Sequence, residues 1–255
     1  MDKLFFSTAA ISNQHGRRTN QDFFDYGLIN HRGYWVVADG LGGHQGGEIA
    51  SKLAVESIVN SFKRYQEISS VAIQKYFETA QNAIINQQKK IPVLSEMRTT
   101  IVLLLADPQF AIWGYAGDTR LYHFRGGRII YQTKDHSVPQ ALANAGDIKP
   151  EEIRFHEDRH RLLRAMGQED QFRPTITAEK KVLQNGDAFL LCTDGFWELV
   201  LENEMEYELT NLADPKTWLD RMQDRILVRS LKKPNKQHDN YTAVAIFVKS
   251  KNNYK

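Results

Sequence analysis

Residues 99–116 read TTIVLLLADPQFAIWGYA, two apolar and strand-forming stretches on either side of Asp107-Pro108. Because Asp-Pro marks a turn, this segment predicts two neighbouring strands, 99–106 and 110–116. Similar signals recur on both sides of it. We expect further strands within residues 1–11 and at 34–38, 120–124, 128–131, 175–182, 188–193 and 241–248, several of them at hairpin spacing.

Two pairs of predicted helices interrupt the strands. Apolar residues at i, i+3, i+4 and i+7 indicate one helix through 55–62 and another through 73–84, capped by Ser69 or Ser70. A second pair is expected at 202–212 and 215–231. Strands and helices do not alternate regularly, as they would in a parallel sheet. The sequence therefore predicts an α+β sandwich with helices on the outer faces of antiparallel sheets.

The composition is that of an ordinary globular protein. Of 255 residues, 42% are hydrophobic and 25% are charged, and 33 Lys and Arg balance 31 Asp and Glu. This balance argues against nucleic-acid binding through a broad basic face. A single cysteine argues against a disulfide framework or a Cys-rich zinc module. No apolar run reaches the roughly 18 residues of a membrane span, so neither nucleic acid nor membrane is an expected partner.

The chain shows no linker, internal repeat or low-complexity tract, so we expect one domain over residues 1–255. Its apolar start is short and is broken by Ser7 and Thr8, which favours a strand over a signal peptide. We therefore expect a cytoplasmic protein. We also expect it to be a monomer.

Five aspartates stand where an apolar strand meets a loop. A single Asp beside Gly is usually a turn residue, but a sheet places strand ends side by side and could bring these carboxylates together. Converging carboxylates repel one another, a cost that a divalent cation removes. All-oxygen ligation suits Mg²⁺ or Mn²⁺ better than zinc. The five are Asp22, Asp39, Asp118, Asp194 and Asp239.

Eight motifs in order make the sequence resemble the metal-dependent protein serine/threonine phosphatases (PPM, type 2C) in their bacterial single-domain form. Each motif is weak alone, but together they span nearly the whole chain. They are Arg17-x-x-Asn20-Gln21-Asp22, Asp39-Gly40-Leu41-Gly42-Gly43-His44, Arg98-Thr99-Thr100, Gly117-Asp118-Thr119-Arg120, Asp135-His136-Ser137, Arg164-Ala165-Met166-Gly167, Thr193-Asp194-Gly195 and Asp239-Asn240-Tyr241-Thr242.

The resemblance implies a fold and a metal site. The fold is a four-layer α/β/β/α sandwich, in which helix pairs flank two antiparallel sheets. The site holds two Mn²⁺ or Mg²⁺ ions and, in bacterial members, a third and weaker one. The resemblance implies a role for each residue. Asp39 would bridge two ions, with the Gly40 carbonyl as a further ligand, and Asp194 and Asp239 would complete the ligands of the second ion. Asp118 and Asp194 would bind the third ion, Asp22 would hold a water molecule of the metal shell, and Arg17 would bind the substrate phosphate.

The implied activity is hydrolysis of phosphoserine and phosphothreonine in protein substrates of a Ser/Thr kinase, a signalling reaction. Two metal ions roughly 4 Å apart would activate water and screen the charge of the phosphate. Arg17 offers a planar fork that matches two phosphate oxygens. Because water is the nucleophile, no phosphoenzyme is expected.

Two positions depart from the family pattern. The family usually has Glu where Gln21 stands, and a neutral amide lowers the expected metal affinity. His44 follows Asp39 by five residues, farther than the acid histidine proposed for some members, which favours a role in orienting the loop over a role as catalytic acid.

Residues 134–167 are rich in charge and poor in apolar periodicity, and they resemble the family's flap beside the active site. Substrate recognition or gating and a plain solvated connection are equally compatible with this composition.

Rival functions fit less of the sequence. Residues 156–160 read HEDRH and match the HExxH zinc-protease signature, but Asp158 and Arg159 are charged where that buried helix needs apolar residues. Cys192 lacks the arginine that cysteine phosphatases place six positions later, where Glu198 stands. The alternative is a catalytically weak or inactive member that binds phosphoproteins, which Gln21 favours and the complete set of aspartates opposes.

Overall fold

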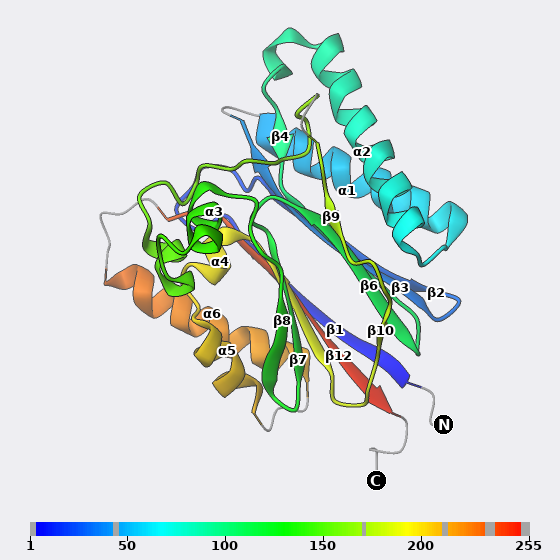
Figure 1. The fold of residues 1–255 in the computed structure, drawn as a ribbon, viewed down its shortest axis with the longest axis vertical. Coiled ribbons are helices and arrows are strands. Elements are labelled where there is room, and N and C mark those ends of the chain that lie inside the picture. Colours follow the sequence, from blue (N-terminus) through cyan, green and yellow to red (C-terminus); the bar gives the residue numbers. More distant parts are fainter. Residues whose placement is uncertain (1–3, 43–45, 170–171, 211–213, 233–237, 251–255) are drawn as a thin grey trace.

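Two antiparallel sheets stack face to face in the computed structural model, which describes residues 4–42, 46–169, 172–210, 214–232 and 238–250 (Figure 1). In spatial order, the first sheet consists of β1 (Leu4–Asn13), β12 (Tyr241–Ser250), β11 (Ala188–Cys192), β7 (Arg120–Arg125) and β8 (Arg128–Gln132). The second consists of β10 (Lys181–Val182), β6 (Phe110–Ala116), β5 (Ile101–Ala106), β3 (Arg32–Leu41) and β2 (Asp22–Ile29), with β4 (Arg98–Thr99) beside β3 and β9 (Thr175–Ile176) beside β6.

Helices cover the outer face of each sheet. The pair α1 (Gly46–Tyr65) and α2 (Ser70–Lys90) packs on the second sheet. The helices α4 (Asp194–Trp197), α5 (Glu202–Leu209) and α6 (Pro215–Leu231) pack on the first. The helix α3 (Val138–Ala145) and the 3₁₀ turns Pro92–Leu94 and Pro150–Phe155 belong to the connections. The expected four-layer α/β/β/α sandwich is confirmed.

Burial on both faces explains why the central strands are apolar throughout instead of alternating with polar residues. In β3, Val36 and Ala38 point toward the helices, while Trp35 and Val37 point toward the other sheet. The strand β5 alternates in the same way, with Leu103 outward. The layer between the sheets is therefore a dry apolar core that holds the strand ends in fixed positions.

Several predicted elements have different bounds; the strand expected at 99–106, for example, is divided at Thr100 into β4 and β5. The strand expected at 175–182 is two short strands, β9 and β10, because the Thr177 hydroxyl accepts the Trp113 N–H at 3.0 Å and interrupts the ladder along β6. The helix expected at 202–212 ends at Leu209, and residues 211 and 212 lie outside the described ranges. The cap of α2 is Ser69, whose hydroxyl accepts the Ala72 N–H.

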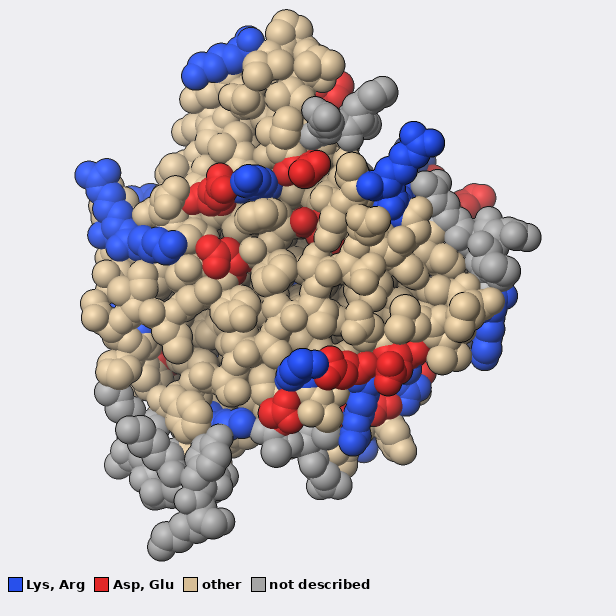
Figure 2. All heavy atoms as spheres, turned by 180° about the vertical axis from the view of Figure 1, so that it is seen from behind, with Lys and Arg blue, Asp and Glu red and all other residues tan. Residues whose placement is uncertain are grey.

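Charges of both signs share the face seen from behind in Figure 2. Lys and Arg residues lie next to Asp and Glu residues in small groups there, and wide uncharged areas separate these groups. The described part of the chain contains no helix that is long and apolar enough to cross a membrane.

Candidate metal centre

The aspartate cluster, which comprises Asp22, Asp39, Asp118, Asp194 and Asp239, gathers at one end of both sheets. Asp22 begins β2 and is the cross-strand partner of Asp39, near the end of β3. Asp118 lies in the turn between β6 and β7, Asp194 begins α4 just beyond β11, and Asp239 precedes β12. All four other carboxylates act electrostatically on Asp39. The structure thus brings together five residues from separate segments.

Burial and repulsion dominate the electrostatics of this cluster. The exposed fractions of Asp22, Asp118 and Asp194 are only 6%, 5% and 8%. Burial, aided by the charges of Asp194 and Asp239, raises the pKa of Asp22 to about 7 despite hydrogen bonds from two threonines. Burial and then the neighbouring carboxylates raise the pKa of Asp39 and of Asp118 well above the ordinary range. The ionised cluster therefore needs positive charge.

The backbone around Gly40 is packed too closely for any side chain. A Cβ at this position would lie 2.0 Å from the Gly47 carbonyl oxygen and 2.7 Å from that of Gln21. The Gly40 N–H donates to the same Gln21 carbonyl at 3.1 Å. These contacts fix the peptide that follows Asp39. His44 lies outside the described residues, so its role stays a prediction.

Asn240 holds the loop that carries Arg17. Its amide donates to the carbonyls of Gln14 and Thr19, and its carbonyl oxygen accepts the Gln21 N–H, all within 3.0 Å. Arg17 then forms a bidentate pair with Asp239, with Nε and Nη2 donating at 2.9 and 2.7 Å. Sequence reasoning placed Arg17 at the site but did not foresee this ion pair.

The donor set fits hard divalent cations. Asp22 Oδ1 and Asp194 Oδ1 are buried and receive no hydrogen bond from the described residues. The other oxygen of Asp22 accepts from the Thr193 hydroxyl at 2.9 Å, which fixes the orientation of the carboxylate. Unpaired buried carboxylate oxygens are costly unless a cation faces them. The predicted ligands are therefore compatible with Mg²⁺ or Mn²⁺.

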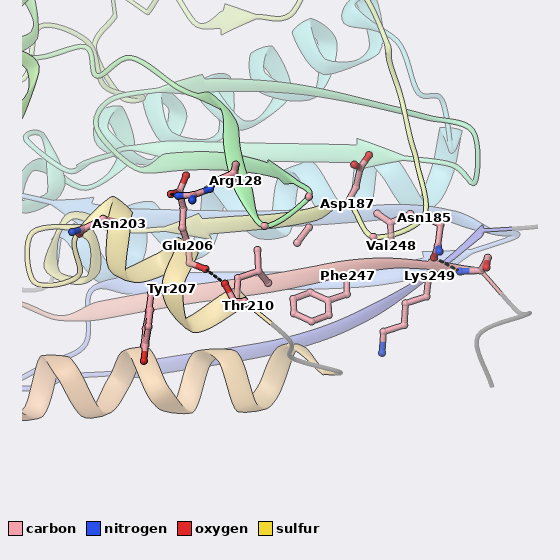
Figure 3. A pocket seen from close by; sticks show the side chains of 16 residues that line it. Arg128, Asn185, Asp187, Asn203, Glu206, Tyr207, Thr210, Phe247, Val248 and Lys249 are labelled. Carbon is pink, nitrogen blue, oxygen red and sulfur yellow. Dashed lines mark hydrogen bonds and ion pairs between the residues drawn. The ribbon is translucent and has the colours of Figure 1, made fainter. Parts of the chain in front are cut away.

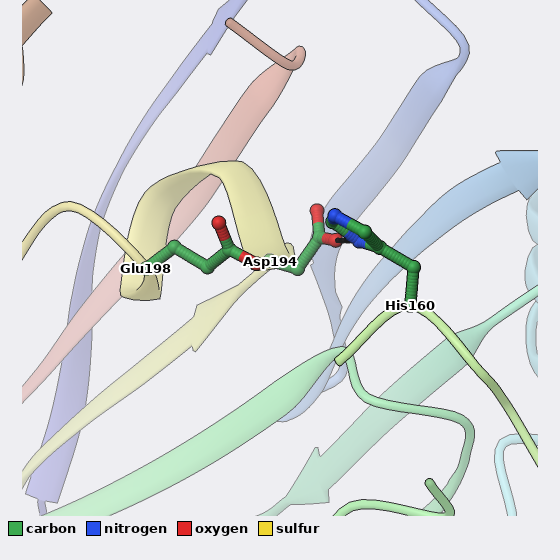
Figure 4. A group of neighbouring side chains, drawn as sticks. All are labelled: His160, Asp194 and Glu198. Atoms are coloured by element: carbon green, nitrogen blue, oxygen red, sulfur yellow. Dashed lines mark ion pairs between the residues drawn. The ribbon is translucent and has the colours of Figure 1, made fainter. Parts of the chain in front are cut away.

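Sequence reasoning missed His160, which approaches the cluster from residues 134–167 (Figure 4). Its Nδ1 lies 3.6 Å from Asp194 Oδ2, and the interaction with that carboxylate raises the pKa of His160. One ligand atom each of His160, Asp194 and Glu198 lie within 4.8 Å of one another. Residues 157–160 form turns and not the α-helix that a zinc-protease motif requires. Only the tertiary fold reveals this contact.

A large cavity lies at the opposite end of the first sheet (Figure 3). Its volume is about 930 Å³, and it is bounded by the β7–β8 turn, the start of β11, the length of α5 and the end of β12. Asp187 directly precedes β11 there, but Arg125 pairs with both of its oxygens at 2.7 and 2.8 Å. This carboxylate is therefore neutralised within the protein, unlike Asp22 and Asp194, whose Oδ1 atoms receive no hydrogen bond from the described residues.

Comparison with known sequences identifies related proteins. The family model described as protein phosphatase 2C matches residues 11–238. Protein phosphatase PhpP of Streptococcus pneumoniae is 30% identical over 213 residues, which cover 80% of this chain and 85% of that protein. Serine/threonine phosphatase stp of Listeria monocytogenes is 32% identical over 179 residues, with coverages of 67% and 69%.

Solved structures are similar over nearly the full chain. The Mycobacterium tuberculosis serine/threonine phosphatase PstP/Ppp superimposes with a TM-score of 0.83 at 27% identity, covering 96% of this chain and 99% of that one. The PstP catalytic domain in complex with two manganese ions gives a TM-score of 0.82 at 27% identity, with coverages of 97% and 100%.

We expect the protein without divalent ions to lose stability as the pH rises from about 4 to about 7. The pKa of Asp22 is about 7 when folded and 3.8 when unfolded, so in this window the folded state holds the extra proton. In EDTA, the melting temperature should fall by about 5 °C between pH 5 and pH 7.5. Asp22→Asn should reduce this dependence without abolishing it, because the pKa values of Asp39 and Asp118 are raised too, and Mn²⁺ should reverse the loss. A flat wild-type profile in EDTA would contradict the prediction.

The two histidines of the HExxH match should behave differently. His160→Asn should weaken Mn²⁺ binding about tenfold, because it removes the nitrogen beside Asp194. His156→Asn is the matched control, since the His156 ring accepts the Asp158 N–H within its own turn and should leave Mn²⁺ binding unchanged. Isothermal titration calorimetry with Mn²⁺ measures both. Equal effects of the two variants would show that the Asp194 contact is irrelevant to metal binding.

Proposed function

Because this chain belongs to the protein phosphatase 2C family, we propose that its aspartate cluster is a two-metal centre that hydrolyses phosphoserine and phosphothreonine in proteins. The chain is a metal-dependent serine/threonine protein phosphatase. We further propose which residues hold the metal ions, how many ions they hold and what each residue does.

One observation carries the proposal. Five carboxylates from separate chain segments meet at one end of the sandwich, and two of their buried oxygens receive no hydrogen bond from described residues. Bound there, two Mn²⁺ or Mg²⁺ ions would acidify a water molecule and screen the phosphate charge. Asp39, on β3 opposite Asp22 of β2, would be shared by the two ions, and Asp194 and Asp239 would complete the ligands of the second ion. Asp22, oriented by the Thr193 hydroxyl, would hold a water molecule of the metal shell.

Arg17 is the residue that binds the substrate phosphate. Its side chain is 44% exposed at the margin of the cluster. Nε and Nη2 are fixed by Asp239, whereas Nη1 has no hydrogen bond within the described ranges and is left to a phosphate oxygen. The Asp239 pair thus orients the guanidinium before substrate arrives, which lowers the entropy cost of binding.

A third and weaker ion is assigned to Asp118 and Asp194, with His160 and Glu198 as additional donors beside Asp194. The neutral amide of Gln21 supplies no charge to the centre, although the Gln21 backbone carbonyl organises it by accepting from Gly40 and from Ser51. We therefore assign this chain a lower metal affinity than relatives with Glu at that position.

Substrate recognition is assigned to the flap, residues 134–167, within one domain of a monomer. Arg159 donates to Glu198, directly after α4, at 2.9 Å, and Arg154 reaches Glu202 at 2.5 Å, so the flap is fixed beside the metal centre. Phe155 and Leu163 are 75% and 47% exposed on it. These apolar side chains are suited to contact a phosphorylated protein, such as a substrate of a Ser/Thr kinase.

Metal removal and Asp39→Asn should both abolish catalysis. With Mn²⁺, the wild type should hydrolyse p-nitrophenyl phosphate and phosphothreonine peptides, and EDTA should stop both reactions. Asp39→Asn should lower kcat about 1,000-fold, because it removes the bridging charge. Asp25→Asn, on the same strand pair but outside the cluster, is the matched control and should retain wild-type rates.

Equal rates for wild type, EDTA-treated protein and Asp39→Asn would refute the metal mechanism. A wild type that binds phosphopeptides but turns over neither substrate would instead establish the phosphoprotein-binding module, the alternative that Gln21 favours.

Gln21→Glu should strengthen metal binding. The new carboxylate adds negative charge beside Asp22, so the Mn²⁺ concentration at half-maximal activity should fall about tenfold at pH 7. In EDTA the same variant should melt at a lower temperature than wild type, because the added charge worsens the repulsion. An unchanged Mn²⁺ requirement would show that Gln21 lies outside the metals' influence.

A further inference from the structure

His136 links the turn before Asp118 to both ends of the flap. Its backbone N–H donates to the Gly117 carbonyl at 2.9 Å, and its carbonyl accepts from the Leu163 N–H at 2.8 Å, near the end of the flap. Its ring stacks on Tyr115 with 4.9 Å between centroids and an angle of 9°. The ring also contacts Thr175, where β9 resumes the sheet.

The Gly117 turn is fixed on both sides by this one residue. The His136 Nδ1 lies 3.1 Å from the Gly117 nitrogen, so the ring receives the N–H while the His136 backbone pairs with the carbonyl. Gly117 has a φ of +102°, and a Cβ there would come within 2.5 Å of the Thr100 side chain. The direction in which Asp118 leaves the strand therefore depends on this turn.

The hydrogen bonds determine the tautomer of the ring. A backbone N–H can only donate, so Nδ1 is an unprotonated acceptor and Nε2 carries the proton. Nε2 then donates to the Thr175 hydroxyl at 2.9 Å. Burial and the nearby Arg164 charge lower the pKa of His136 to about 4, which keeps the ring neutral at ordinary pH.

We propose that His136 is a positioning residue for Asp118: its neutral ring fixes the Gly117 peptide and couples that turn to the two ends of the flap. The proposal rests on the proposed function, because Asp118 matters as the ligand of the third ion. His136 itself touches neither metal nor substrate.

Two amide variants separate the Gly117 bond from the rest of the ring's contacts. His136→Asn places an oxygen where Nδ1 stood and can still accept the Gly117 N–H, whereas His136→Gln extends to the Nε2 position and cannot. Both lose the stacking on Tyr115 equally, so they control for each other. His136→Gln should increase amide hydrogen exchange at Gly117 at least tenfold and raise the Kd of the weakest Mn²⁺ about tenfold. Its kcat should fall with KM for a phosphothreonine peptide unchanged.

His136→Asn should rescue these properties to within about threefold of wild type. Indistinguishable Asn and Gln variants, both folded by circular dichroism, would overturn the proposal. Nitrogen NMR of the wild-type ring tests it without any variant, because a proton on Nδ1 would overturn it too. Exchange at Gly117 and the ring tautomer are independent of turnover. A wild type without Mn²⁺-dependent activity would therefore refute the proposed function while these two measurements still decide whether His136 fixes the turn.

Discussion

Mutual repulsion among buried carboxylates is the constraint that the rest of this site depends on. Side chains that repel one another separate when their backbone is free to move, so a rigid scaffold has to hold them together. The sandwich provides it, because strands buried on both faces pack at the density of a crystal and leave their ends little freedom. The acidic cluster therefore depends on the apolar sheets, because the stability of the packed core offsets the free-energy cost of holding the carboxylates together.

Local contacts refine the positions that the sheets provide. Asn240 joins the Arg17 loop to the start of β12 through three hydrogen bonds between its side-chain amide and backbone groups. Thr193 orients Asp22 and also accepts the Thr242 N–H, so β11, β12 and β2 meet at one hydroxyl. The motifs that surround each aspartate in the sequence consist largely of these supporting groups. This explains why a motif such as Asp-Asn-Tyr-Thr extends beyond the single aspartate it contains.

The sequence predicted the layers and the grouping of the aspartates because both depend on patterns within short segments. Apolar runs mark strands, and an Asp at each strand end marks the shared edge. Contacts between distant segments leave no such pattern. The hydroxyl of Thr177 divides a predicted strand, His160 reaches Asp194 from the flap, and Arg17 pairs with Asp239. Each depends on side-chain directions that only the assembled fold sets, so sequence reasoning missed all three.

Buried aspartates elsewhere in this chain show that the cluster is exceptional. Asp135 is paired with Arg120 through two hydrogen bonds of 2.8 and 2.7 Å. Burial alone would raise the pKa of Asp187, but the interactions with Arg125, His123 and the Gln184 N–H together outweigh burial and bring it down to about 2. The fold thus supplies arginine where a buried carboxylate is structural.

In the cluster the pattern is reversed. Arg17 pairs with Asp239 at the exposed margin, while the buried Oδ1 atoms of Asp22 and Asp194 receive no donor from the described residues. Buried carboxylates are costly when no positive charge faces them. Where a protein pairs some of its buried aspartates with arginine and groups others without one, the grouped aspartates are suited to bind a cation from solution. The contrast between the two ends of β11, Asp187 with its arginine and Asp194 within the cluster, is therefore an independent argument for a metal centre at the second.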